Sequence, residues 1–300
     1  MWNDALAGRR IIVTGGAAGL GYFTSERLAA AGARVVLTAR SLERGARAAA
    51  SIRELVPGAR VDVVELDLAD LASVARAARE LAAHPVDGLI ANAGVLPWDR
   101  PPATRDGFEP AFGTNHLGHF ALLAQLHHAL THDAGIVSLG SLSAIGLRLR
   151  FDDLMHERRR TPPYLVYGRS KLAVMTFAVE LHRRIVASAR PGIRSVIAHP
   201  GYATDAHSPR RPGITEDSTA AFRMLVRGFA HSKDSGAAIS IAALARGRGG
   251  ELWGPGAWHR LGGEPVVQPL RGPVLDPTAG RRLWEVSEAL TGVEFRIPPA

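Results

Sequence analysis

The sequence predicts a doubly wound α/β fold, in which helices cover both faces of a parallel β-sheet, and two observations support this prediction. Short apolar runs rich in Val, Ile and Leu alternate with segments of helical periodicity. The connections between them are short, as in strand–helix–strand repeats that build parallel sheets. Because no long linker interrupts the chain and hydrophobic residues make up 46% of its 300 residues, we expect one domain spanning residues 1–300.

Six apolar runs predict the buried strands, at Arg10–Thr14, Arg34–Ala39, Val61–Leu66, Gly88–Ala91, Gly135–Leu139 and Ile193–Ala198. Between them, apolar residues recur at helical spacing over Leu20–Ala31, Leu42–Leu55, Leu71–Ala83, Phe112–Leu130 and Ser170–Ala187. In a doubly wound sheet, ligands bind at the carboxyl ends of the strands. We therefore expect the functional site along that edge of the sheet.

The last third of the chain is less regular. His207–Gly213 is rich in Pro and Arg, and Gly254–Pro273 is rich in Gly and Pro, so both are predicted loops. Asp276 is a typical N-cap, and the proline after it suits the first position of a helix. With Gly292 as a stop, these signals predict a terminal helix over Pro277–Thr291.

Composition narrows the class of protein. The absence of cysteine excludes disulfides, thiol nucleophiles and cysteine-ligated zinc, and it fits a cytoplasmic location. The net charge of +8 invites a nucleic-acid hypothesis, but the arginines are scattered and Arg158–Arg160 is the one tight cluster, so we expect no nucleic-acid partner. The longest stretch without Asp, Glu, Lys or Arg, Pro110–His132, carries five histidines, which favours a buried helix over a membrane span. No acid within that apolar helix converges on His116 and His119, so we expect packing roles for them and no bound metal.

A glycine-rich segment follows the first predicted strand and opens the first predicted helix, and its sequence is Thr14-Gly15-Gly16-Ala17-Ala18-Gly19-Leu20-Gly21. Glycines let a pyrophosphate approach the backbone, and the helix start offers free N–H groups and a positive dipole end. An ordinary glycine-rich turn has the same composition, but the flanking strand and helix favour a dinucleotide-binding loop. The residues expected to bind the cofactor here are Thr14, Gly15, Gly19, Leu20 and Gly21.

The end of the second predicted strand bears on which dinucleotide binds. A site that prefers NAD(H) places a carboxylate near this end to hold the ribose hydroxyls. The nearest acid is Glu43, whereas Arg40 is placed to pair with a 2′-phosphate. Although 34 arginines are spread over the chain, this pattern favours NADP(H) over NAD(H).

Tyr167 and Lys171 lie four residues apart, and such residues share one face of a helix. A phenol beside an ammonium group is expected to have a lowered pKa, so it can act as general acid in one direction and general base in the other. The chain has only two lysines, Lys171 and Lys233, and one of them falls in this motif. The alternative is a surface lysine beside a core tyrosine.

Together these motifs resemble those of the classical short-chain dehydrogenase/reductases, a Rossmann-type family, over roughly Arg9–Thr204. The resemblance adds cofactor-binding positions after the third, fourth and sixth strands, namely Asp67, Leu68, Asn92, Ala93, Gly94, Pro200, Gly201 and Thr204. It implies four catalytic positions, namely Asn115, Ser141, Tyr167 and Lys171. The match is closest to the retinol-dehydrogenase-like branch, in which the sequence motif of Asn115–His119 and the extra stretch Leu147–Pro163 recur.

The resemblance implies an NADP(H)-dependent alcohol dehydrogenase/carbonyl reductase that acts on a small-molecule alcohol or carbonyl compound. Ser141 and Tyr167 would polarise the carbonyl, Lys171 would hold the ribose and tune the phenol, and Asn115 would order a water. An NADP(H)-binding redox-sensing or regulatory protein without turnover is the alternative, although a tuned phenol would bring it no advantage. Either a homodimer or a homotetramer fits the family.

The same resemblance divides the chain into a cofactor-binding and catalytic core at residues 9–200, substrate loops and helices at 201–276, and the terminal helix at 277–291. Specificity should come from loops, and the candidates are Val95–Gly107, Leu147–Pro163, Tyr202–Thr215 and Gly254–Pro273. Their Leu, Trp and Pro content favours an apolar or bulky substrate, and three tryptophans are candidate pocket residues, namely Trp98, Trp253 and Trp258. One departure from the family pattern is Ala91, which stands where an asparagine is usual.

Overall fold

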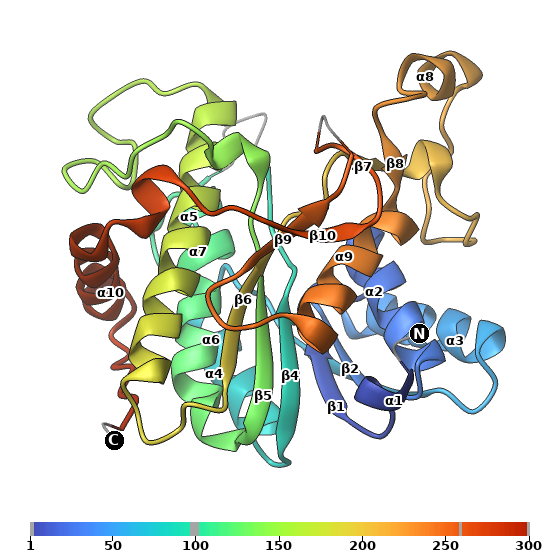
Figure 1. Cartoon of the computed structure of the whole chain (residues 1–300), viewed down its shortest axis with the longest axis horizontal. Helices are drawn as coiled ribbons and strands as arrows, with labels where there is room; N and C mark the ends of the chain where they lie inside the picture. Colours follow the sequence, from blue (N-terminus) through green and yellow to red (C-terminus); the bar gives the residue numbers. More distant parts are fainter. Residues whose placement is uncertain (1–2, 97–101, 258–259, 299–300) are drawn as a thin grey trace.

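The architecture is that of a computed structural model, which describes residues 3–96, 102–257 and 260–298. Its centre is an eight-stranded sheet with the order β10-β9-β6-β5-β4-β1-β2-β3 (Figure 1). The strands are β1 Arg10–Val13, β2 Arg34–Ala39, β3 Arg60–Glu65, β4 Val86–Ala91, β5 Leu130–Leu139, β6 Arg194–Ala198, β9 Leu252–Pro255 and β10 Pro265–Gln268. Each pair of neighbours is parallel except β9 and β10, which are antiparallel. The predicted doubly wound fold is confirmed, and all six predicted strands are present.

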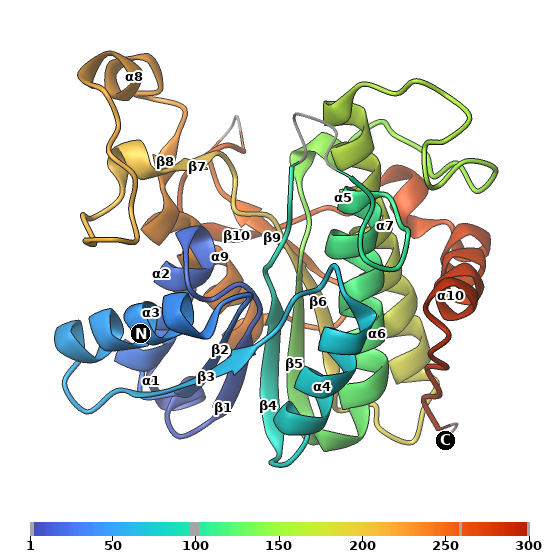
Figure 2. The same cartoon turned by 180° about the vertical axis from the view of Figure 1, so that it is seen from behind.

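Helices cover both faces of the sheet, as Figures 1 and 2 show. One layer consists of α2 Gly19–Ala30, α3 Leu42–Leu55 and α9 Lys233–Arg246, and the other of α4 Leu71–Leu81, α6 Gly118–Leu126 and α7 Pro163–Val186, with α10 Pro277–Thr291 outside α7. The core is divided in the same way. Phe23, Ile52 and Ile241 belong to one buried cluster, whereas Phe120 and Trp284 belong to the cluster on the opposite face.

Several short elements complete the described chain. They are α1 Asn3–Leu6, α5 Pro110–Phe112, the π-turn Gly113–Leu117, the 3-10 turns His127–Ala129, Leu142–Ala144, Asp205–His207 and Gly272–Leu275, α8 Ala220–Leu225, and a two-stranded ladder of β7 Ala203–Thr204 with β8 His231–Ser232. The stretch 147–162 has no helix or strand, and Leu149, Leu154 and Met155 pack it against the core cluster that contains Phe120. No helix within the described residues is long and apolar enough to cross a membrane.

Helix boundaries follow the capping residues. The carboxylate of Asp276 accepts hydrogen bonds from the backbone N–H groups of Thr278 and Ala279, and Gly292 ends α10 in a left-handed conformation with φ of 66°. The terminal helix therefore spans the predicted range. The helix that carries Tyr167 begins at Pro163 rather than at the predicted Ser170, because proline occupies its first turn.

Two predictions about elements were wrong, and one helix was missed. Gly254–Pro273 is not all loop, because it contains the end of β9 and the whole of β10. Both strands are short, β10 is the edge strand, and the prolines stand at the ends of the strands, where proline is tolerated. The predicted helix Phe112–Leu130 is broken by a π-turn, and Leu130 already belongs to β5. Helix α9 was not predicted, since its small buried residues give little periodic contrast.

Candidate active site

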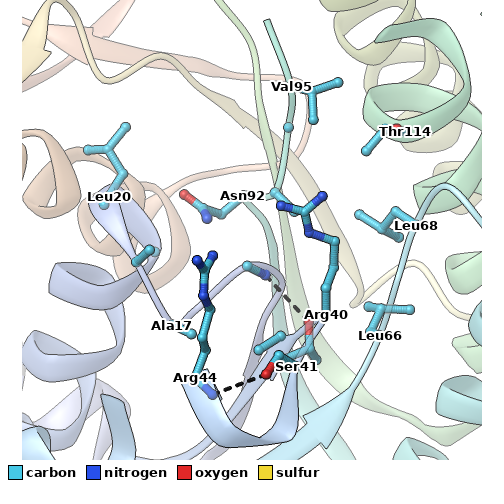
Figure 3. Close-up of a pocket in the computed structure, with 18 of the residues that line it drawn as sticks. Ala17, Leu20, Arg40, Ser41, Arg44, Leu66, Leu68, Asn92, Val95 and Thr114 are labelled. Carbon is cyan, nitrogen blue, oxygen red and sulfur yellow. Dashed lines mark hydrogen bonds between the residues drawn. The ribbon is translucent and has the colours of Figure 1, made fainter. Parts of the chain in front are cut away.

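A cavity of about 760 Å³ opens at the carboxyl ends of β1, β2, β3 and β4 (Figure 3). Ten of the predicted cofactor-binding residues line it, namely Gly15, Gly19, Leu20, Gly21, Arg40, Asp67, Leu68, Asn92, Ala93 and Gly94. Such a position is expected for the ligand of a doubly wound sheet. These ten residues, which are spread over the first 94 positions of the chain, therefore surround one cavity.

The glycine-rich loop forms one wall of this cavity and is shaped for close approach. A Cβ atom at Gly21 would overlap the carbonyl oxygen of Gly15, so only glycine fits there. The start of α2 has no side-chain cap, because its N-cap residue is Ala18. Its first N–H groups are therefore left for a ligand, and an anionic pyrophosphate fits this donor set.

Thr14 does not line the cavity, because it is fully buried behind the glycine-rich loop. Its hydroxyl oxygen accepts hydrogen bonds from the backbone N–H groups of Asn92, at 2.9 Å, and Ala93, at 3.0 Å. The amide of Asn92 in turn donates to the carbonyl oxygen of Thr14 at 2.8 Å. Thr14 therefore joins the end of β1 to the end of β4 and positions residues that do reach the cavity.

His119 continues this connection towards the predicted catalytic residues. Its Nδ1 lies 2.9 Å from the carbonyl oxygen of Asn115, which can only accept, so Nδ1 carries the proton. Burial lowers the pKa of His119 to about 4 and keeps the ring neutral. Its Nε2, 2.8 Å from the Thr14 hydroxyl, must then accept a hydrogen bond from it. The imidazole thus fixes the π-turn of Asn115 to the start of the cofactor loop.

The neighbouring histidine has a different environment. The Nε2 of His116 lies 2.7 Å from the hydroxyl of Ser287 in α10, and burial lowers the pKa of His116 to about 3. The two histidines therefore bond in different directions, and no cluster of three or more potential metal ligands occurs among the described residues.

Two arginines line the cavity where β2 leads into α3. Arg40 follows β2 and Arg44 lies in the first turn of α3, and Figure 3 shows both side chains extending into the cavity. Within the described chain, neither guanidinium group has an ion-pair partner. Glu43, the nearest acid, is paired with Arg47 at 2.7 Å and does not line the cavity. Sequence reasoning missed Arg44, although its place one turn beyond Arg40 could have indicated it.

Asn115 lies in the π-turn and is almost completely buried. Its side-chain oxygen accepts from the N–H of Val95 at 2.7 Å, and its nitrogen donates to the carbonyl oxygen of Val95 and to the hydroxyl of Ser170. Because Ser170 donates in turn to the carbonyl oxygen of Tyr167, the amide ties the end of β4 to α7.

Lys171 is 5% exposed, and its ammonium group donates to the carbonyl oxygen of Leu139 at 2.9 Å. Burial lowers the pKa of Lys171 from 10.5 to about 8. Its Nζ lies 5.9 Å from the centre of the Tyr167 ring. A Cβ at Gly94, in the cavity wall, would come within 3.4 Å of Nζ and 3.1 Å of the Asn115 side-chain oxygen. Asn115 and Lys171 therefore both lie directly behind that wall.

The phenol of Tyr167 corrects one prediction. Burial raises its pKa, the nearby hydroxyl of Ser141 lowers it, and Tyr164 raises it further, so that the net shift is upward. The predicted lowering by Lys171 is wrong for this structure. The physical reason is that desolvation of the phenol dominates, while the ammonium group is bonded to a backbone carbonyl on β5.

Ser141 and Tyr167 lie close together because α7 packs tightly against the turn Leu142–Ala144. Ser141 follows β5 and begins a 3-10 turn, and its hydroxyl accepts hydrogen bonds from Ser143. A Cβ atom at Gly168 would lie 2.5 Å from the carbonyl oxygen of Ser143. Glycine at this position therefore lets the helix approach the turn that carries Ser141.

The loop after β6 lies at the same edge of the sheet, but Pro200, Gly201 and Thr204 do not line the cavity. His199 fixes this loop to β10, because its Nε2 lies 3.0 Å from the side-chain oxygen of Gln268. The hydroxyl of Thr204 is buried and has no hydrogen-bond partner among the described residues.

Of the three candidate tryptophans, Trp98 and Trp258 lie outside the described residues. Trp253 is a core residue rather than a pocket residue, since it is 8% exposed and its Nε1 donates to Glu251. The cavity also contains residues that the sequence analysis did not single out as cofactor ligands, namely Asp205, Ile214, Glu216 and Lys233.

The cavity at the strand ends is lined by glycines, and Asn115 and Lys171 are buried behind its wall at Gly94. With Ser141 close to Tyr167, these features define a nucleotide-binding oxidoreductase with a Rossmann-type fold. The family model for short chain dehydrogenases matches residues 9–152. A "Probable oxidoreductase" of Streptomyces lividans is 35% identical over 93% of this chain and 96% of its own. Human "Retinol dehydrogenase 13" is 33% identical over 96% of this chain and 86% of its own. The chain belongs to the short-chain dehydrogenase family.

Solved structures with a similar fold agree with this family assignment. An uncharacterised protein from Mycobacterium paratuberculosis has a TM-score of 0.80 at 34% identity, covering 97% of this chain and 96% of that one. A short chain dehydrogenase from Burkholderia cenocepacia, solved in complex with NADP, has a TM-score of 0.61 at 25% identity, covering 81% and 93%. The predicted family is thus confirmed, and the chain is an oxidoreductase of a family that uses NAD(P)(H).

Proposed function

We propose that this protein is an NADP(H)-dependent carbonyl reductase/alcohol dehydrogenase. The observation that carries the proposal is the grouping of four polar side chains around α7, two of them directly behind the wall of the dinucleotide cavity. Tyr167 and Ser141 are close enough for the serine hydroxyl to affect the phenol, and Asn115 and Lys171 share the cavity wall at Gly94. A carbonyl oxygen placed between the two hydroxyl groups would receive hydrogen bonds from both.

The cofactor, when bound, supplies or accepts the hydride. In reduction, Ser141 stabilises the developing negative charge on the substrate oxygen, and the Tyr167 phenol gives that oxygen its proton, so an alcohol is formed. The raised pKa of Tyr167 keeps the phenol protonated at neutral pH, which suits a general acid. Lys171 holds a positive charge near the phenol ring. Asn115 fixes its own turn, Gly113–Leu117, to α7 through its hydrogen bond to Ser170.

The substitution Tyr167→Phe tests this proposal. It removes the transferable proton without removing the ring, so we expect the kcat for carbonyl reduction to fall by about 10²- to 10⁴-fold. The affinity for NADPH should stay within about twofold, as measured by fluorescence titration. Tyr164→Phe is the matched control, because Tyr164 is 51% exposed on the same helix. Near-normal turnover of Tyr167→Phe across a panel of aldehydes and ketones would exclude the proposed role.

The preference for NADP(H) rests on Arg40 and Arg44. Both line the cavity without an ion-pair partner in the described chain, while the nearest carboxylate, Glu43, is held by Arg47. We expect Arg40→Ala/Arg44→Ala to weaken NADPH binding about 10- to 100-fold, the range for a lost hydrogen bond to a charged group, and to leave NADH binding unchanged. Arg47→Ala controls for lost surface charge. Equal losses for both dinucleotides would show that the arginines do not recognise a 2′-phosphate.

An apolar alcohol or carbonyl compound is the proposed substrate class. Large apolar side chains are exposed in the segments that follow β5 and β6, namely Ile145, Tyr202 and Phe229. Tyr202 and Phe229 are stacked with ring centres 5.8 Å apart. The name of the human relative, a retinol dehydrogenase, supports a lipophilic substrate. A panel of matched short and long aliphatic aldehydes tests this, since kcat/KM should rise with chain length.

A further inference from the structure

Lys233 stands out because the chain has only two lysines and both lie beside the cofactor cavity. Lys171 lies behind the wall at Gly94, near the chemical end. Lys233 is the first residue of α9 and lines the cavity at the other end of the glycine-rich loop. Its Nζ would be 3.8 Å from a Cβ at Gly19, the residue that begins α2. A cation is therefore held where the diphosphate of a dinucleotide would meet the loop.

The partner of Lys233 is an unusual feature of an anion-binding cavity. Nζ forms an ion pair with one carboxylate oxygen of Asp205, whose side chain is 8% exposed. The other oxygen of Asp205 is buried and has no hydrogen-bond partner in the described part of the chain. Asp205 and Glu216 both line the cavity. A diphosphate would repel these carboxylates unless a cation stood between them.

Neighbouring contacts fix the position of this pair. Arg27 of α2 and Asp234 of α9 are joined by two hydrogen bonds, and Arg211 binds Glu26 of α2 through two contacts of 2.8 Å. Leu20 and Gly236 also pack closely, since a Cβ at Gly236 would lie 2.8 Å from the Leu20 side chain. The start of α9 is thus held against the glycine-rich loop without help from Lys233.

We propose that Lys233 is a second, cationic ligand of the cofactor diphosphate, and that Asp205 is its counterion, which opposes cofactor binding whenever the lysine charge is missing. The inference rests on the proposed function, because it takes an NADP(H)-type dinucleotide as the ligand. The lysine would give the diphosphate a positive charge that the glycine-rich loop, built only of backbone donors and small side chains, does not contain.

The effects of two substitutions on NADPH affinity distinguish this role from a purely structural ion pair. Lys233→Ala and Asp205→Asn both break the ion pair, so a structural role predicts the same effect from both. As a diphosphate ligand, Lys233→Ala should weaken binding of NADPH about 10- to 100-fold, the range for hydrogen bonds to charged groups. Asp205→Asn should tighten it, because the repulsion is removed. Adding Asp205→Asn to Lys233→Ala should recover part of the loss.

Two cofactor fragments locate the effect. ADP-ribose contains the diphosphate without a 2′-phosphate, and 2′-AMP contains the 2′-phosphate without a diphosphate. Measured by calorimetry on the full chain, Lys233→Ala should weaken ADP-ribose and spare 2′-AMP, whereas Arg44→Ala should do the reverse. Asp234→Asn is the control, since it breaks the adjacent ion pair with Arg27 outside the cavity and should change neither affinity.

The outcomes separate the two proposals. If the wild-type protein binds neither NADPH nor NADH, both the proposed function and this inference are wrong. If it binds NADPH but Lys233→Ala binds ADP-ribose as tightly as wild type, or if Asp205→Asn weakens binding as Lys233→Ala does, only the inference is overturned. Circular dichroism of each variant confirms that the comparison is made on folded protein.

Discussion

The ammonium group of Lys171 is a positive charge that the fold buries almost completely from solvent. The side chain is 5% exposed, and its pKa falls from 10.5 to about 8 because of burial. At neutral pH the folded protein therefore carries a charge that the unfolded chain would solvate better. This penalty is the physical cost of placing an ammonium group behind Tyr167 and Gly94.

The cost can be measured through its pH dependence. The folded-state pKa lies below the unfolded value, so the unfolded chain binds more protons between pH 8 and about 10.5, and the penalty shrinks as the pH rises through this window. Relative to Lys171→Met, we expect the wild-type free energy of unfolding to rise with pH, by about 3 kcal/mol over the full window. Urea unfolding of both proteins from pH 7.5 to 9.5 checks this. A constant difference would mean that Lys171 is not desolvated.

Sequence spacing indicated candidate site residues but not the pKa values of their side chains. Motif order indicated Asn115, Ser141 and Lys171, and in the structure Asn115 and Lys171 lie behind the cavity wall at Gly94, while Ser141 lies close to Tyr167. It gave the wrong direction for the pKa of Tyr167, since desolvation depends on which atoms surround the ring. Lys233 could not be placed, because it meets Gly19 across more than 200 residues of sequence.

At the scale of elements, the approach of α7 to the turn after β5 decides whether the hydroxyl groups of Ser141 and Tyr167 meet. Gly168 permits that approach, with the carbonyl oxygen of Ser143 only 2.5 Å from where a Cβ would stand. A larger residue must push the helix away, because neither backbone can yield easily. The catalytic geometry therefore depends on a residue that performs no chemistry.

Gly168→Ala tests this dependence. Alanine favours a helix by about 1 kcal/mol over glycine, which offsets part of the 1–3 kcal/mol expected for overpacking, so we expect only a small loss of stability. The kcat for carbonyl reduction should nevertheless fall at least about tenfold, since small displacements of catalytic groups are costly. NADPH affinity should not change. Gly280→Ala in α10 is the control, and full activity of Gly168→Ala would show that the two hydroxyl groups tolerate a wider separation.

Elements with strong periodic contrast were predictable, and elements without it were not. The strands β1 to β6 are bounded by helices and carry dense Val, Ile and Leu runs, so their existence was correctly predicted. Helix α9 consists mainly of small residues buried on several sides, and β9 and β10 are only four residues each. Their structure comes from tertiary packing, which a local pattern does not contain.

At the scale of the whole molecule, the C-terminal helix supports α7 from outside. Phe120, Phe177 and Trp284 lie in edge-to-face or tilted contacts with ring centres 5.5–5.6 Å apart. Phe295 stacks on Trp284 at 4.7 Å, and the guanidinium group of Arg184 lies 4.0 Å from the Trp284 ring. The aromatic cluster joins α6, α7, α10 and the C-terminal segment into one layer.

Trp284→Ala should therefore destabilise the protein by about 3–5 kcal/mol, the range for removing a large buried aromatic side chain. Guanidinium chloride unfolding measures this, with Val267→Ala, which is 52% exposed on β10, as the control. Because the cluster lies away from the cavity, the protein that remains folded should bind NADPH normally. A loss below about 1 kcal/mol would show that α10 contributes little to the fold.

The hydrogen-bond chain through His119 connects the glycine-rich loop at Thr14 to the turn that carries Asn115, so each depends on the other for its position. The hydroxyl of Thr14 accepts from two N–H groups and gives its one hydrogen to the imidazole, whose single proton goes to Asn115. Both ring nitrogens of His119 are bonded within this chain, so a displacement of Thr14 or Asn115 leaves a buried nitrogen without its partner. Nucleotide loop and catalytic turn should consequently assemble as a unit, and a half-built site should be a rare species during folding.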